Sequence, residues 1–92
     1  MKTIYKYPLS ITDYQTVKMP VRSKILTVQV QSGHLFLWAM INSCEGNMAE
    51  YPVWIFGTGH EITEPEATIR YVSTVQFDSG HLVFHVFVGA ED

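Results

Sequence analysis

A nine-residue sequence occurs twice in the chain, and each copy has the pattern of a β-hairpin. Residues 27–35 read Thr-Val-Gln-Val-Gln-Ser-Gly-His-Leu, and residues 74–82 match them at seven of nine positions. Each copy has a strand pattern, a Ser-Gly pair and then a second apolar strand, which is typical of a tight antiparallel hairpin. Two interpretations stay open: chance convergence on good hairpin chemistry, or two structurally equivalent hairpins. Equivalent hairpins would place Trp38 and His85 at corresponding positions.

The rest of the chain also consists of short strand patterns separated by turn residues. We expect strands over residues 4–7, 14–19, 26–31, 35–41, 51–56, 69–77 and 82–88. The apolar run 35–41 suggests a strand covered on both faces. No segment shows a helical period with capping residues. The sequence therefore predicts an all-β fold, a small antiparallel sandwich or partly open barrel of about seven strands with little or no helix. We expect a single domain over residues 1–92.

The composition of the chain indicates its cellular compartment and limits the kinds of partner that it can bind. Apolar residues make up 47% of the chain and charged residues 16%, which suits a packed core rather than a disordered segment. The net charge is −3, and the basic residues form no stripe of the kind that duplex binding needs. The single cysteine, Cys44, cannot form an internal disulfide, and no apolar run is long enough for a membrane span. We expect a soluble, cytoplasmic protein that binds neither duplex nucleic acid nor membranes.

The most unusual polar segment is Gly57-Thr58-Gly59-His60, which follows an aromatic strand. Its glycines leave backbone N–H groups unobstructed, while Thr58 and His60 add a hydroxyl and an imidazole. Such a set suits a small anionic ligand. The segment is not a dinucleotide fingerprint, because Ile62 stands where the third glycine belongs. The alternative interpretation is a glycine-rich turn that binds nothing.

A ligand at this segment would need further residues around it. Trp54, Tyr5 and Trp38 are the candidate aromatic walls, and Lys6 is the candidate positive charge for an anion. His85 lies between two apolar neighbours in the last strand. We interpret it as a buried, hydrogen-bonded histidine, with a pocket residue as the alternative.

Motifs for metal binding or catalysis are missing from the sequence. His81 and His85 lie roughly 13 Å apart on an extended strand, too far to share a zinc ion. Cys44 has the carboxylate of Glu45 beside it, which disfavours a reactive thiolate. No spacing indicates a nucleophile with its base. We therefore expect no metal, no cofactor and no enzymatic activity.

Three motifs carry a resemblance to a known family: Ile-Tyr-Lys-Tyr-Pro at residues 4–8, Phe-Gly-Thr-Gly-His at 56–60 and Val-Phe-His-Val-Phe at 83–87. On these motifs the chain resembles a family of small proteins of unassigned function that bacteriophages, prophages and some bacteria encode. The likeness covers nearly the whole chain. It implies an accessory protein of a phage in the host cytoplasm, and it brings no established activity.

Three classes of function remain open. The first is a non-enzymatic binder that sequesters a small anionic, nucleotide-like ligand in counter-defence. The second is a protein-binding inhibitor of a host defence complex or nuclease, and the third is a structural or virion-associated protein. We also expect a homo-oligomer, most simply a dimer, because the edges of a small sheet need cover.

Overall fold

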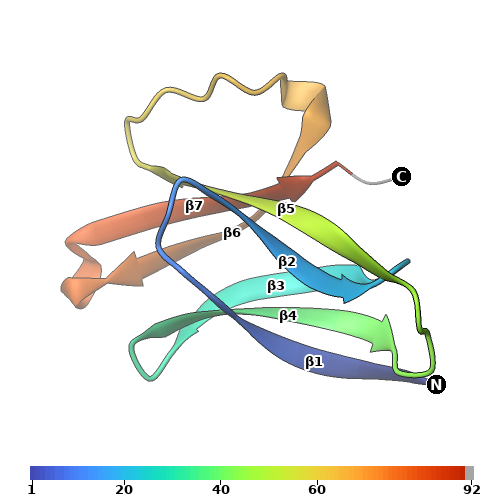
Figure 1. The fold of residues 1–92 in the computed structure, drawn as a ribbon. Helices are drawn as coiled ribbons and strands as arrows, with labels where there is room; N and C mark the ends of the chain where they lie inside the picture. The colour runs from blue at the N-terminus through green and yellow to red at the C-terminus, as the bar shows by residue number, and fades with distance from the viewer. Residues whose placement is uncertain (91–92) are drawn as a thin grey trace.

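Seven antiparallel strands form two sheets in the computed structural model, which describes residues 1–90 (Figure 1). The strands are β1 (Lys2–Leu9), β2 (Tyr14–Pro20), β3 (Lys24–Gln31), β4 (His34–Asn42), β5 (Met48–Gly57), β6 (Ile69–Phe77) and β7 (Leu82–Gly89). One sheet has the order β1-β4-β3 and the other the order β2-β5-β7-β6. Two 3-10 turns, η1 (Glu66–Thr68) and η2 (Asp78–Gly80), are the only helical segments in the described part. The predicted all-β sandwich is confirmed.

The core lies between the sheets and follows the period-2 alternation of the strands. β4 shows this most clearly, because every second residue from Leu35 to Ile41 is buried. The intervening Phe36, Trp38 and Met40 are half-buried and face outward. The prediction that this run is covered on both faces is therefore wrong: the outer face carries apolar side chains that pack on one another, as the Phe36 and Trp38 rings do.

The two nine-residue copies form hairpins of the same register. Thr27 of β3 pairs with Trp38 of β4, and Thr74 of β6 pairs with His85 of β7. Both first strands also carry a register irregularity shortly before the paired threonine. The expected correspondence of Trp38 and His85 is confirmed.

The turns of the two hairpins agree at their Ser-Gly pairs and differ in width. Ser32 and Gly33 have φ values of 53° and 79°, and Ser79 and Gly80 have values of 53° and 89°. These are left-handed conformations, which glycine adopts without steric strain. In the second hairpin Asp78 also has a positive φ of 54°, and η2 makes the turn wider. The resemblance between the copies thus extends from sequence to backbone geometry, apart from this wider turn.

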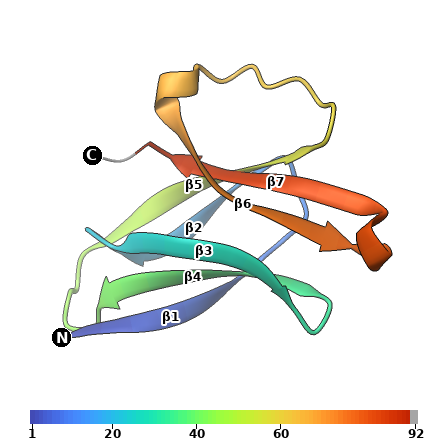
Figure 2. The same ribbon diagram turned by 180° about the vertical axis from the view of Figure 1, so that it is seen from behind.

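One side of the sandwich is closed where β3 and β6, the edges of the two sheets, run side by side in the same direction (Figure 2). Ser73 of β6 is the one buried polar residue of the described chain. Its Oγ accepts a hydrogen bond from the Val28 backbone N–H at 3.1 Å and lies 3.2 Å from Thr27 Oγ1. The Ser73 hydroxyl thereby provides an acceptor for the Val28 N–H, a backbone donor at the edge of β3 that has no partner within the sheet of β3.

The longest connection joins β5 to β6 and includes η1. It forms an arch, coloured yellow to orange, beside the four-stranded sheet (Figures 1 and 2). We call residues 58–68 the arch. Within residues 1–90 no helix is long and apolar enough to span a membrane.

Candidate functional site

The Gly-Thr-Gly-His segment forms a tight turn at the end of β5, in which the His60 ring folds back over Gly57. The His60 N–H donates to the Gly57 carbonyl at 3.1 Å, and the Gly57 N–H donates to His60 Nδ1 at 3.3 Å. A Cβ on Gly57 would lie 2.9 Å from His60 Cε1, so any other residue at this position would displace the ring. Gly59 has a φ of 91°, a conformation that favours glycine. Both glycines therefore have a structural role, and together they hold His60 in place.

The contact with Gly57 also determines which nitrogen of His60 carries the proton. Nδ1 accepts the backbone N–H, so in the neutral ring the proton resides on Nε2. Nε2–H is then a donor that the turn itself does not use.

Thr58 connects this turn to His85 on the neighbouring strand β7. Thr58 Oγ1 lies 2.7 Å from His85 Nε2, and His85 Nδ1 lies 3.1 Å from Thr74 Oγ1 of β6. Thr74 Oγ1 in turn lies 2.7 Å from the Tyr71 hydroxyl. Chains of hydrogen bonds of this kind polarise one another and favour a single arrangement. Three elements, the arch, β7 and β6, are thereby joined through one imidazole.

His85 faces outward and is only half-buried, so the interpretation of it as a core histidine is wrong. Val86 and Val88 fill the inner face of β7, and the alternation of the strand directs His85 to the opposite face. There it pairs across the sheet with Phe56 and Thr74.

A hollow of about 200 Å³ lies at this place. We call it the arch hollow, and the residues that matter for its chemistry are Phe56, Thr58, His60, Tyr71, His85 and Phe87. The rings of Phe56 and Tyr71 each lie 5.6 Å from the ring of Phe87 in edge-to-face geometry. The hollow thus combines aromatic walls with hydroxyl and imidazole groups. None of the described residues that line it is a lysine or an arginine.

The structure separates some of the residues that the sequence grouped together. Tyr5, Lys6 and Trp38 belong to β1 and β4 of the three-stranded sheet, with Lys6 paired opposite Trp38. Lys6 Nζ donates to Gln31 at 2.8 Å and lies 4.4 Å from the centre of the Phe36 ring. The prediction that these three residues complete the pocket is wrong, because the pocket is built on the other sheet.

Trp54 lies on the correct sheet but outside the hollow. It pairs with Phe87 in the β5–β7 register, and its ring lies 5.4 Å from the ring of Tyr14. Trp54 therefore extends the aromatic surface next to the hollow without lining it.

The sequence analysis missed Tyr71, Thr74 and Phe87 as residues of this site. It considered His85 as a pocket residue only as the alternative to a core histidine. One signal could have found them: buried Val86 and Val88 imply that His85 and Phe87 share the opposite face of their strand. The residues across the sheet, Tyr71 and Thr74, needed the register of β6 against β7.

Comparisons with known proteins place the whole chain in one family. A family model described as a domain of unknown function (DUF7352) matches residues 1–92. No curated protein and no solved structure matches the chain. In residues 1–90, no group of three or more His, Cys, Asp and Glu side chains is arranged to hold a metal ion.

Proposed function

The chain belongs to the DUF7352 family, and we propose that it is a non-enzymatic binding protein that holds a small, nucleotide-like ligand in the arch hollow. One observation carries this proposal: the 2.7 Å contact between Thr58 Oγ1 and His85 Nε2. It joins the Gly-Thr-Gly-His turn to the Phe-His-Val-Phe strand, the two segments that stand out in the sequence. A concave, mostly apolar site with a few convergent polar groups is the usual form of a small-ligand site.

The geometry favours the flat ring of such a ligand over its charged part. A base can stack on the aromatic walls of Phe56, Tyr71 and Phe87, and stacking contributes about 1–3 kcal/mol per base. His60 Nε2–H and the Thr58 hydroxyl can bind the polar edge of the ring. A volume of about 200 Å³ accommodates one ring system. The phosphate of a nucleotide would then lie at the mouth of the hollow, in contact with solvent.

The resemblance to phage-encoded proteins supports a biological role for this binding. The protein would act in the host cytoplasm as an accessory protein of a phage and sequester a small signalling nucleotide in counter-defence. An inhibitor that binds a host defence complex or nuclease and a structural, virion-associated role are the alternatives. Neither alternative draws support from a particular feature of the arch hollow.

The pair of Thr58 and His85 also allows a second candidate function, that of a hydrolase. A hydroxyl within hydrogen-bond distance of an imidazole is the arrangement of a nucleophile with its base. The sequence shows no spacing that indicates such a pair, because Thr58 and His85 are 27 residues apart in the chain. The orienting group, however, is the neutral Thr74 hydroxyl, where acyl-transfer triads use a carboxylate. We therefore keep binding without turnover as the proposal.

A panel of nucleosides, nucleoside phosphates and cyclic dinucleotides tests the proposed function. At a ligand concentration a hundredfold above Kd, binding stabilises the folded state by about 2.7 kcal/mol. For a domain of this size that corresponds to a rise in Tm of roughly 10–20 °C. The bound compound should be recovered unchanged by mass spectrometry. A panel without any effect on Tm contradicts the binding proposal, and recovery of a cleaved product favours the hydrolase.

We further propose that two copies associate through β1, the free edge of the three-stranded sheet. Ile4 and Tyr5 on this edge are 56% and 49% exposed, and an unpaired strand edge is a template for a second chain. Analytical ultracentrifugation should show a species of twice 10.5 kDa, and Ile4→Asp should shift it toward the monomer. A monomer alone at the highest attainable concentration contradicts this proposal.

A further inference from the structure

A second and larger hollow, of about 790 Å³, lies between the two sheets. Its walls come from the β2–β3 turn and β3 on one side and from β5, β6 and β7 on the other. It lies beside the first residues of β3 and β6, upstream of the Thr27–Ser73 contact that joins these strands. We call it the basic cleft, and its lining includes Arg22, Lys24, Ile25, Tyr51, Arg70 and Val88.

The charge of the basic cleft differs from the charge of the whole chain. The chain has a net charge of −3, yet three of its six lysines and arginines line this one cleft. No aspartate or glutamate is among the described residues that line it. Arg22 and Lys24 lie close together in the sequence, whereas Arg70 comes from another sheet. The fold thus creates a positive potential that no segment of the sequence shows by itself.

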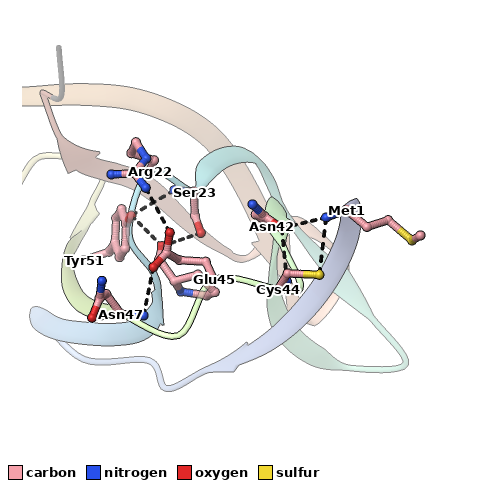
Figure 3. Close-up of polar contacts among 9 residues, drawn as sticks. Met1, Arg22, Ser23, Asn42, Cys44, Glu45, Asn47 and Tyr51 are labelled. Atoms are coloured by element: carbon pink, nitrogen blue, oxygen red, sulfur yellow. Dashed lines mark hydrogen bonds and ion pairs between the residues drawn. The ribbon is translucent and has the colours of Figure 1, made fainter.

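Arg22 is held in place at the rim of the cleft. Its Nη2 lies 2.9 Å from Glu45 Oε1, and Glu45 Oε2 accepts the Asn47 N–H at 3.0 Å (Figure 3). The side chain of Arg22 is 80% exposed and that of Glu45 only 15%. A guanidinium has five N–H donors in a fixed plane, and the contact with Glu45 uses one edge of it. The solvent-exposed side of Arg22 can therefore bind an anion, which competes with the Glu45 carboxylate for the guanidinium.

The turn that carries Arg22 is attached to the floor of the cleft. The Tyr51 hydroxyl accepts the Ser23 N–H at 3.0 Å (Figure 3). It also donates to the Pro20 carbonyl at 2.9 Å. Tyr51 itself is 9% exposed and is one of the residues that line the cleft. Ile25 and Val88 line the same floor as core residues that are 7% and 1% exposed. The basic cleft is thus cationic at its rim and apolar at its base.

We propose that the basic cleft binds a phosphate monoester that carries an apolar or flat body, as a site separate from the arch hollow. The phosphate contacts Arg22, Lys24 and Arg70, since arginine binds phosphate through paired N–H groups and lysine binds it as a point charge. The body of the ligand packs on Ile25, Tyr51 and Val88. The proposal does not depend on the function assigned to the arch hollow, whose described lining includes no lysine or arginine.

Isothermal titration with phenyl phosphate and with inorganic phosphate tests this site. Phenyl phosphate should bind about tenfold more tightly, because its ring adds apolar contact area. The affinity should fall as salt is raised. Lys24→Gln combined with Arg70→Gln should weaken binding about a hundredfold, roughly tenfold for each charge-assisted contact. Glu45→Gln removes the competing carboxylate and should strengthen binding.

Two control variants test whether phenyl phosphate binds in the basic cleft itself. Lys18→Gln removes an exposed lysine of β2 outside the cleft and should leave binding unchanged. Thr58→Ala with His60→Ala alters only the arch hollow, so a loss that Lys24→Gln/Arg70→Gln causes in this background is a loss of binding at the basic cleft. The melting temperature without ligand shows whether each variant is folded, and Arg70→Gln alone serves if the double variant is not.

Three results would overturn the proposal: no binding of phenyl phosphate to the wild-type chain, an equal loss in Lys18→Gln, or no loss in folded Lys24→Gln/Arg70→Gln. In the Thr58→Ala/His60→Ala variant, adenosine monophosphate and a short-chain phosphatidic acid then distinguish the source of the phosphate bound at the basic cleft. Tighter binding of the first identifies a nucleotide, and tighter binding of the second identifies a lipid.

Discussion

Replacing Thr58 and His60 together with alanine is expected to weaken binding of the nucleotide-like ligand about a hundredfold and to leave the fold nearly intact. The change removes the Thr58 hydroxyl that lies 2.7 Å from His85 and the Nε2–H donor of His60. Each lost hydrogen bond with a ligand weakens binding by about tenfold when its partner stays unpaired. Both side chains are exposed, so the free energy of unfolding should change little. Melting temperatures measured at increasing ligand concentration report both the affinity for the ligand and the stability of the protein without it.

His34→Ala is the matched control for this variant. His34 is an exposed histidine at the start of β4, on the other sheet. Its replacement should leave the affinity unchanged. If folded Thr58→Ala/His60→Ala binds the ligand as the wild type does, the arch hollow is not the site. If that double variant unfolds, the segment acts mainly as a structural turn.

Leu37→Ala is expected to have the largest effect on stability. Leu37 of β4 is 0% exposed and pairs with Val28, which is also fully buried. Removing a buried leucine lowers the free energy of unfolding by about 2–5 kcal/mol, through lost apolar contact and the cavity that remains. For a domain of this size that corresponds to a fall in Tm of roughly 10–30 °C. Thermal unfolding followed by circular dichroism measures it.

The control for Leu37→Ala is Leu82→Ala at the start of β7. Leu82 is 50% exposed, so its truncation should change stability by no more than about 0.5 kcal/mol. Equal destabilisation by the two substitutions would contradict the placement of the core between the sheets. A small effect of Leu37→Ala would contradict it as well.

The strands could be read from the sequence because each depends on its own residues. β6 spans Ile69–Phe77, the range that the pattern predicts, and the other strands start or end within a few residues of their predicted ranges. Alternation of apolar and polar residues encodes which side of a strand faces the core. Alternation is not visible in the sequence of residues 35–41, because the outward-facing residues are apolar as well and the run therefore has the pattern of a strand buried on both faces.

The arch hollow was only partly predictable. Gly57 to His60 could be identified from their own chemistry, since glycines beside a hydroxyl and an imidazole are unusual after a strand. Tyr5, Lys6 and Trp38 were assigned to the same pocket without knowledge of their sheet, and the structure places them on the other one. Aromatic residues are frequent in this chain, so their type alone could not locate the walls.

The sequence by itself determined the local features: seven strands, the two hairpin patterns and the Gly-Thr-Gly-His turn. Only the tertiary structure decided the strand order, in which β5 lies between β2 and β7. That order brings Thr58 to His85, and the packing of the two sheets brings Arg70 to the same cleft as Arg22. The physical reason is that alternation specifies a buried face but not the strand that pairs beside it. Pairing between distant strands depends on how all the side chains fill one shared core.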